Sequence, residues 1–318
     1  MSDKSSKKPW KNDIAVLCIF FARPEILAKS FASVREARPR KLLLWQDGPR
    51  EGRSDDVENI NRCRKIVEDI DWECEVYTNY HDKNMGCDPS THYAHKWAFT
   101  IVDKCIILED DIVPAQSFYP FCKELLDKYE SDPRVDRICG MNLLLKYDND
   151  GADYFFSQYG SSWGWATWKR VANTWDTDYS FLQYKRAIQN LRAREASEKQ
   201  REIVIKRLLK EKQSGIPYWE MVTGIRTLLY NGLVIYPTKN LIQNVGLSSN
   251  STHAPESINL IDKKSRNYFF SNLYEYPFPL KHPRYMFDDI NYRNECAKRF
   301  HQTFWEKALG KVRRFLKR

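Results

Sequence analysis

The 318-residue sequence has no run that approaches the ~20 consecutive apolar residues needed to span a membrane as a helix. Residues 1–13 are polar and contain no apolar stretch, so we expect no secretory signal there. The eight cysteines form no C-x-x-C pair, and no histidine stands near them at zinc-site spacing. Scattered thiols are typical of a reducing compartment. These absences predict a soluble, cytoplasmic protein without a disulfide framework.

The folded body also lacks the basic excess that a nucleic-acid groove would need. The net charge of +9 lies in the two ends of the chain: residues 298–318 carry +7, with eight Lys or Arg against one Glu, and residues 1–13 carry +2. Residues 14–297 are therefore formally neutral. The sequence is 42% hydrophobic and 14% aromatic, which excludes wholesale disorder. We expect a globular protein that does not bind nucleic acid.

The C-terminal segment 298–318 has an amphipathic pattern. Its apolar residues recur at steps of three and four, with the cations between them. A helix of this kind can bind an anionic membrane surface, and it can equally pack on the protein with its cations in water. Both interpretations stay open. The first predicts a peripheral location at the inner face of the cell membrane.

Short apolar runs alternate with helical patterns in the first third of the chain. Strands are predicted over residues 14–20, 41–45, 73–77 and 105–108, and helices over 24–37, 57–70 and 91–101. This alternation predicts an α/β protein with a parallel sheet, whose ligands collect at the carboxyl ends of the strands.

The rest of the chain is less regular. An aromatic stretch is followed by a long charged segment with a helical pattern, 180–213. A further helix is predicted over 217–230 and a strand over 233–236. Residues 255–297, rich in proline and aromatics, predict an irregular arm.

Three consecutive carboxylates, Glu109, Asp110 and Asp111, follow the apolar run Cys105–Leu108. At a buried strand end they repel one another and lose hydration unless a cation is present. Oxygen ligands suit Mg²⁺ or Mn²⁺, which usually share their ligand shell with substrate phosphates. The alternative is a solvated acidic turn at the start of a helix. The apolar strand before the triplet favours the metal site.

Other polar residues stand where nucleotide or catalytic groups are expected. Asp47 and Arg23 each follow a strand, so they can face one pocket; a plain turn and a surface ion pair are the alternatives. Glu220 begins a helix and can act as a general base, or simply complement the helix dipole. His253 lies in a polar loop and can bind a metal or a diphosphate, or be merely exposed.

Three tryptophans, Trp163, Trp165 and Trp168, lie within six residues and surround Gly164. Flat aromatic rings suit the C–H faces of sugars, and glycine permits a close approach. Core packing is the alternative interpretation, and we expect it for at least one of the three.

Taken together, these segments resemble the GT-A nucleotide-sugar glycosyltransferases, in particular a bacterial branch similar to the eukaryotic N-acetylglucosaminyltransferase I group. The matching stretches over residues 14–255 are IFFARPE, LLWQDGPR, IILEDDIVPAQSFYPFCKELL, SSWGWATWKR, YWEMVTGIRTLLYNGLVIYP and NLIQNVGLSSNSTHA. The resemblance implies a Rossmann-like GT-A fold with a mostly parallel sheet. It places the nucleotide-binding half at 14–140, the acceptor half at 141–255 and a C-terminal extension at 256–318.

The resemblance also implies how the donor, a UDP-sugar, is bound. Asp111 would be the direct ligand of Mn²⁺ or Mg²⁺, and Glu109 and Asp110 would contact the ribose and the donor sugar. Asp47 would contact the uracil, and Arg23 would be a second nucleotide contact. The resemblance favours N-acetylglucosamine as the donor sugar, and glucose, galactose and N-acetylgalactosamine stay open because they would need only small changes of the pocket.

On the acceptor side, the resemblance implies an inverting transfer to a hydroxyl of a glycan or glycolipid. Glu220 falls at the position of the catalytic base, where the family more usually has Asp. His253 falls in the loop that closes over the diphosphate and the metal. Trp163, Trp165 and Trp168 would border the acceptor.

Two other functions stay open. A nucleotidyltransferase also uses metal-bound carboxylates and a nucleotide, but it would normally show a glycine-rich, basic phosphate loop early in the chain, which FFARPE is not. A non-catalytic carbohydrate- or membrane-binding protein would use the tryptophans and the basic C-terminal segment. Metal-dependent hydrolysis of a UDP-sugar separates the enzyme from this binder.

Overall fold

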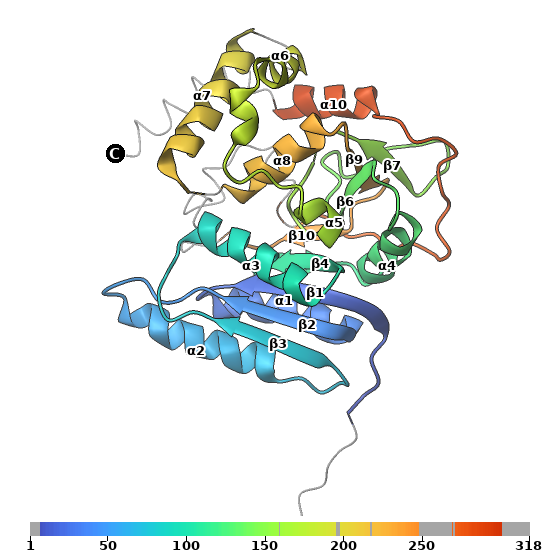
Figure 1. The fold of residues 1–318 in the computed structure, drawn as a ribbon. Helices are drawn as coiled ribbons and strands as arrows, with labels where there is room; N and C mark the ends of the chain where they lie inside the picture. The colour runs from blue at the N-terminus through green and yellow to red at the C-terminus, as the bar shows by residue number, and fades with distance from the viewer. Residues whose placement is uncertain are drawn as a thin grey trace, which may run out of the picture.

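The predicted N-terminal strands form the parallel part of one sheet, in the order β3-β2-β1-β4 (Figure 1). The computed structural model describes residues 7–158, 160–194, 198–216, 218–247, 269 and 271–300. The four strands are β1 (Asn12–Phe20), β2 (Pro39–Gln46), β3 (Glu75–Tyr80) and β4 (Lys104–Glu109). The helices between them are α1 (Pro24–Ala37), α2 (Ser54–Glu68) and α3 (Cys87–Ile101).

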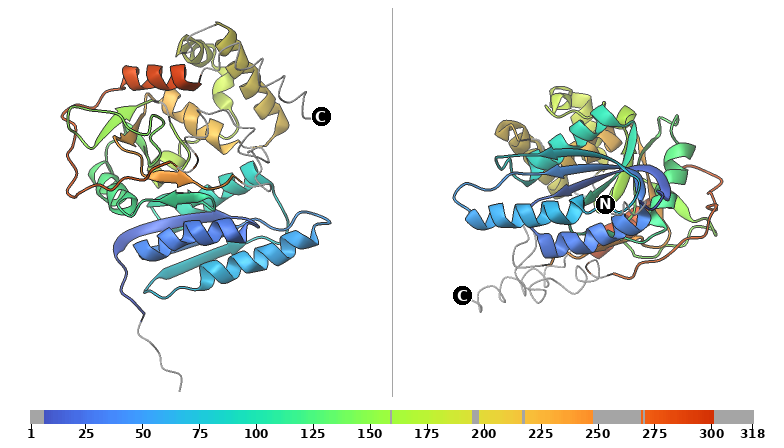
Figure 2. Two further views of the ribbon diagram at one scale, coloured as in Figure 1. Left: turned by 180° about the vertical axis from the view of Figure 1, so that it is seen from behind. Right: turned by 90° about the horizontal axis from the view of Figure 1, so that it is seen from below.

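Alternate residues of the central strands pack into opposite layers. In β1, Val16 and Cys18 share a core with α1, α2 and α4 (Phe118–Lys128), whereas Leu17 and Ile19 share a core with α3. Burial of both faces explains why the parallel strands are near-continuous apolar runs. Figure 2 shows α1 and α2 side by side along one face of the sheet.

The second half of the chain extends the same sheet. Its strands are β6 (Val135–Cys139), β7 (Tyr154–Ser157), β8 (Trp165–Trp168) and β9 (Leu233–Pro237). Strand β8 is antiparallel to both β4 and β6, and β9 is parallel to β6. The full order is β3-β2-β1-β4-β8-β6-β9-β7. The predicted α/β class, with a mostly parallel, Rossmann-like sheet between helices, is confirmed.

Two short strands form a separate antiparallel pair, β5 (Ile112–Pro114) with β10 (Ile242–Asn244). This pair begins directly after the acidic triplet, and Val245 donates its backbone N–H to the carbonyl of Asp111 at 2.9 Å. The chain near residue 245 is thereby held against the end of β4.

The segment with a helical pattern over 180–213 consists of separate helices. The segment forms η1 (Ser180–Gln183), α6 (Lys185–Arg194) and α7 (Glu198–Ser214). Leu191 of α6 and Leu208 of α7 are buried in one cluster with Val222 of α8 (Trp219–Leu229). Separate helices bury this apolar surface together, which a single straight helix could not do.

The predicted irregular arm is partly described. Residues 271–289 contain no helix or strand, and they lead into α10 (Ile290–Phe300). A short helix, α5 (Lys169–Ala172), follows β8. His253, the boundary at residue 255 and the part of the amphipathic segment from 301 to 318 lie outside the described residues.

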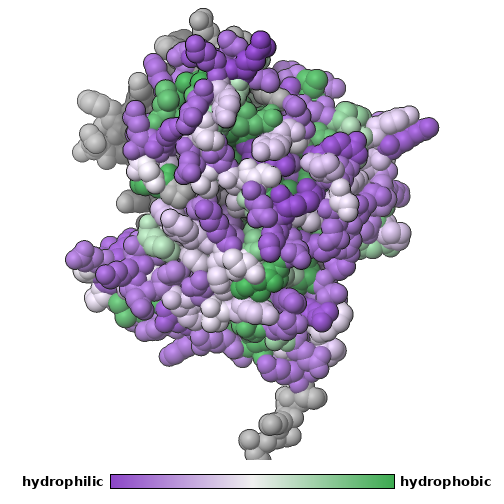
Figure 3. All heavy atoms as spheres, in the orientation of Figure 1, coloured by the Kyte–Doolittle hydropathy of each residue, from purple (hydrophilic) through white to green (hydrophobic). Residues whose placement is uncertain are grey.

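Among the described helices, none combines the length and the apolar character that crossing a membrane requires. The face of the molecule seen in Figure 3 is largely hydrophilic, with small, separated hydrophobic areas. All eight cysteines are free thiols in the described structure.

A histidine of α3 is enclosed by tryptophans. His95 is fully buried, and the rings of Trp165, Trp175 and Trp219 meet it edge-to-face at centroid distances of 5.1–5.8 Å. Neither ring nitrogen of His95 has a hydrogen-bond partner. Burial, with smaller effects of His92 and Arg137, lowers the pKa of His95 to about 3, so the ring is neutral at pH 7.

We expect His95→Phe to stabilise the protein. Phenylalanine keeps the aromatic contacts and removes two unpaired buried nitrogens, which is worth about 1–3 kcal/mol at pH 7. In the unfolded state His95 binds a proton below about pH 6.5, whereas in the folded state it does so only below about pH 3. Because the unfolded state binds more protons between these values, the wild type loses stability as the pH falls through this range. At pH 4.5 the variant's advantage should therefore be ~3 kcal/mol larger. Urea unfolding at both pH values, with exposed Tyr93→Phe as the control, measures this.

Candidate active site

The acidic triplet and Arg23 meet at the carboxyl ends of β4 and β1. Ile19 pairs with Glu109 in the register of these strands, and each chain continues from there into the site. The Arg23 guanidinium binds both carboxylate oxygens of Asp110, with Nε 3.1 Å from Oδ2. Its Nη2 is also 3.2 Å from Oδ2 of Asp111. The sequence predicts that Arg23 faces one pocket with Asp47, and the contacts that the structure gives Arg23 are with Asp110 and Asp111.

The site holds more negative than positive charge. Burial raises the pKa of Glu109 well above its usual range, and the charges of Asp111, Asp110 and Glu220 raise it further. Burial and the charge of Asp110 raise the pKa of Asp111 to about 6, against the opposing effect of Arg23. One guanidinium therefore does not neutralise the carboxylates gathered here, and added positive charge would be bound favourably.

Asp111 is the carboxylate with room for a cation. Both oxygens of Asp110 are bound by Arg23, whereas Asp111 has only one contact with that guanidinium. A Cβ atom at Gly246 would overlap the Asp111 carboxylate, so the glycine lets the backbone lie directly against this carboxylate. No three His, Cys, Asp or Glu side chains in the described residues are grouped to enclose an ion. The donors fit a hard divalent cation that completes its shell with water or substrate oxygens.

Asp47 has a different environment from the one predicted. Its carboxylate accepts hydrogen bonds from the backbone N–H groups of Gly48, Met85 and Gly86 at 2.9–3.2 Å and from the Asn84 side chain at 3.0 Å. Burial raises the pKa of Asp47, and these bonds oppose that effect. Asp47 thus ties β2 to the turn before α3. A base could contact this carboxylate only by replacing one of these bonds.

Glu220 reaches the acidic cluster from the first turn of α8. Ser162 Oγ donates a hydrogen bond to Oε1 of Glu220 at 2.5 Å. The charge of Glu220 raises the pKa of Glu109, although the two residues are far apart in sequence. The fold therefore brings the predicted base within electrostatic range of the end of β4.

The tryptophans separate into two groups. Trp165 and Trp168 are each 2% exposed; Trp165 stacks on Trp219, and Trp168 Nε1 donates to the carbonyl of Leu126. Alternation along β8 directs these two rings into the sheet's packing layers, so neither can border an acceptor in this structure. Trp163 is only partly buried, and its ring lies 5.3 Å from that of Phe269. The acceptor prediction therefore depends on Trp163 alone.

The structure adds residues that the sequence reasoning missed. Ser162 and Gly246 give no sequence signal, because only the fold brings them to Glu220 and Asp111. Arg137 did give one: it and Asp136 are two charged residues within the short strand Val135–Cys139, and Arg137 is 5% exposed. A charge in a central strand is costly and suggests a specific role.

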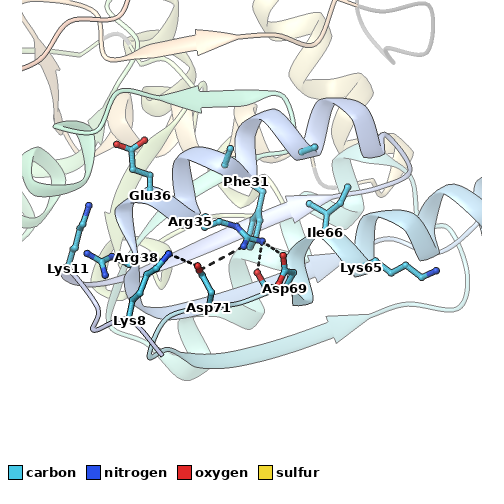
Figure 4. A pocket seen from close by; sticks show the side chains of 12 residues that line it. Lys8, Lys11, Phe31, Arg35, Glu36, Arg38, Lys65, Ile66, Asp69 and Asp71 are labelled. Carbon is cyan, nitrogen blue, oxygen red and sulfur yellow. Dashed lines mark hydrogen bonds and ion pairs between the residues drawn. The ribbon is translucent and has the colours of Figure 1, made fainter. Parts of the chain in front are cut away.

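A hollow of about 750 Å³ lies elsewhere, between α1 and α2 (Figure 4). Its rim includes Lys11, which precedes β1, and Arg38, which precedes β2, so it opens at the amino ends of the strands. Lys8 and Arg35 are paired there with acidic neighbours. The candidate active site is at the opposite end of the sheet, where the carboxylates gather.

Comparison with known proteins assigns no family. No protein-family model matches the sequence, and no curated protein matches it. The resemblance to the N-acetylglucosaminyltransferase I group is therefore not supported by these comparisons.

Some solved structures are distantly similar. The mannosyltransferase PcManGT from Pyrobaculum calidifontis, in complex with GDP-Man and Mn²⁺, is 11% identical over 54% of this chain and 49% of its own, with a TM-score of 0.34. A UDP-glucose pyrophosphorylase complexed with UDP-glucose is 8% identical over 72% of this chain and 92% of its own, with a TM-score of 0.37. The match to the mannosyltransferase spans about half of that protein. At these scores the similarities assign no function to this chain.

Proposed function

We propose that this chain is a metal-dependent, inverting glycosyltransferase that moves a sugar from a UDP-sugar to a hydroxyl group of a glycan or glycolipid. One observation carries the proposal: Glu220, held by Ser162, lies close enough to the carboxylates at the end of β4 for its charge to raise the pKa of Glu109. A group that can bind the donor's cation and a group that can take the acceptor's proton then lie in one site. Sugar transfer from a nucleotide needs both.

In the proposed reaction each polar group has a defined part. A divalent cation bound by Asp111 would neutralise the diphosphate leaving group. Arg23 holds Asp110 and keeps the strand end in place. Ser162 occupies Oε1 of Glu220, which leaves Oε2 free to accept the proton of the attacking hydroxyl. Attack on the face opposite the leaving group would invert the anomeric carbon.

The finer parts of the proposal come from the sequence resemblance. N-acetylglucosamine is the proposed donor sugar, and Trp163 is the proposed acceptor contact. The products distinguish this function from that of a nucleotidyltransferase, because glycosyl transfer releases UDP whereas nucleotidyl transfer breaks the bond between the two phosphates. A non-catalytic binder would release neither.

We expect Asp111→Asn to abolish metal-dependent UDP binding. Asparagine keeps the size of the side chain but removes the charge that would hold the cation between protein and diphosphate. Calorimetric titration of UDP into the wild type should show binding with Mn²⁺ and its loss with EDTA. The variant should bind at least about 10-fold more weakly with Mn²⁺, as expected when one charged ligand is lost.

Asp103→Asn is the matched control. Asp103 directly precedes β4 at the other end of the same strand and is 85% exposed, so its loss should leave UDP binding unchanged. Wild-type protein that binds no UDP under either condition would contradict the proposed function. Equal binding by wild type and Asp111→Asn would contradict the role of Asp111.

A further inference from the structure

Arg137 is a buried cation without an ion-pair partner among the described residues. Among the described residues, its hydrogen bond is a long one, from Nη2 to Oγ1 of Thr227 at 3.4 Å, and its guanidinium lies 5.6 Å from the Trp165 ring centre. Arginine stays charged in proteins, and burying an uncompensated charge is strongly unfavourable. We therefore expect a negatively charged group near Arg137, beyond ion-pair distance but close enough to stabilise the buried guanidinium.

Arg137 supports the loop that precedes β8. A Cβ atom at Gly160 would lie 3.2 Å from Cζ of Arg137, so the glycine lets the backbone lie directly against the guanidinium. Cys139 lies two residues after Arg137 and on the same face of β6. Its thiol donates a hydrogen bond to the carbonyl of Ser161 at 3.1 Å. Strand β6 thus holds consecutive residues of this loop.

The same loop holds Glu220. Ser162, the next residue, donates the 2.5 Å hydrogen bond to the Glu220 carboxylate. Thr227, which contacts Arg137, lies two turns further along the helix that carries Glu220. Arg137 therefore contacts both the loop that binds Glu220 and the helix on which Glu220 stands.

Glu220 is the carboxylate whose charge acts on Arg137. The other acidic groups that do so are Cys139, whose pKa burial raises to about 11, and Tyr236, whose pKa burial raises well above its usual range. Both are neutral at pH 7. From α3, His95 also faces Arg137 and is neutral. Only the Glu220 carboxylate supplies the compensating charge within this set.

We propose that Arg137 is a positioning residue for Glu220, which fixes the direction of the carboxylate. The buried guanidinium also places a positive charge on the Arg137 side of Glu220, and such a charge favours a carboxylate over a carboxylic acid. This inference rests on the proposed function, since it assigns Arg137 a part in the reaction for which Glu220 is the base.

The test is the pH dependence of Mn²⁺-dependent UDP release from UDP-N-acetylglucosamine, with water as the acceptor, between pH 5 and pH 9. Arg137→Met should lower kcat about 10-fold at pH 7 and move the acidic limb of the profile upward by about one pH unit. The KM for the donor should stay unchanged, because Arg137 contacts none of the donor-binding carboxylates. Arg137→Lys should return the acidic limb towards the wild-type position.

A purely structural role predicts a different result. If kcat falls equally in Arg137→Met and Arg137→Lys with the acidic limb unmoved, or if Arg137→Met leaves the profile unchanged, the inference is overturned while the proposed function stands. If the wild type releases no UDP, the proposed function and the inference both fail. Calorimetric UDP binding checks the fold of each variant. Should Arg137→Met fail to fold, Arg137→Gln replaces it with the same expected shift.

Discussion

Replacing Glu220 with Gln should lower turnover by about 10²–10⁴-fold, the range typical of losing a general base. Glutamine has the shape of glutamate, and its carbonyl oxygen can still accept the hydrogen bond from Ser162, so α8 and the loop before β8 should keep their geometry. What is lost is the oxygen that takes the proton. UDP release from UDP-N-acetylglucosamine with Mn²⁺ present measures the effect.

Donor binding should survive in this variant. The cation and the diphosphate are proposed to bind at Asp111, which Glu220 does not contact through any hydrogen bond or ion pair in the described residues. Calorimetry should therefore give a UDP affinity close to the wild-type value. Near-normal turnover of Glu220→Gln would reject Glu220 as the base without affecting the assignment of Asp111. Glu130→Gln, a substitution at a surface glutamate, is the control.

A smaller change tests the role of the hydrogen bond to Glu220. Ser162→Ala removes the donor while leaving the carboxylate in place, so its effect on kcat should be clearly weaker than that of Glu220→Gln. A Ser162→Ala variant as impaired as Glu220→Gln would mean that holding the side chain matters as much as its ability to accept a proton.

The parallel half of the fold was predictable because its signals are local. The run Ile14–Phe20 and the helix Pro24–Ala37 carry their own evidence, namely a continuous apolar stretch, and a proline followed by helical periodicity. The carboxyl ends of such strands must share one edge of the sheet, so Arg23 and Asp110 could be expected to meet. The structure places a bidentate ion pair there.

The antiparallel half was not predictable in the same way. Trp165 and Trp168 belong to a short strand, and their burial depends on β4 and β6 lying on either side of it. Nothing within the segment itself distinguishes a core tryptophan from one that binds sugar. Likewise, the sequence around Asp47 is compatible with a ligand contact. In the structure its carboxylate accepts hydrogen bonds from the backbone amides of residues 85 and 86, which are distant in sequence.

The attachment of Glu220 to the site was only half visible. A glutamate in the first turn of a helix is an ordinary helix start. Only the resemblance assigns Glu220 a function. What places it is the packing of α8 on the sheet, and that packing includes a buried ion pair between Arg226 and Asp136. The loss of this pair is the second large effect that we expect.

Arg226→Met should destabilise the protein by about 3–5 kcal/mol, the cost typical of leaving one member of a buried ion pair without its partner. Asp136 is 1% exposed, and its second carboxylate oxygen already lacks a hydrogen-bond partner. Arg226 also donates to Thr174 at 2.9 Å and lies over the Tyr230 ring. Urea unfolding followed by tryptophan fluorescence measures the loss.

The double variant tests the cause. Adding Asp136→Asn to Arg226→Met removes the uncompensated charge, so the double variant should be less destabilised than the single variant Arg226→Met. Arg134→Met, at a 61% exposed arginine that pairs with Asp132 just before β6, should cost at most about 1 kcal/mol. If the double variant were the less stable, lost packing would explain the effect of Arg226→Met better than a buried charge. Because α8 carries Glu220, the same loss of docking should lower turnover in proportion to the unfolded fraction, whereas Glu220→Gln lowers turnover with the fold intact.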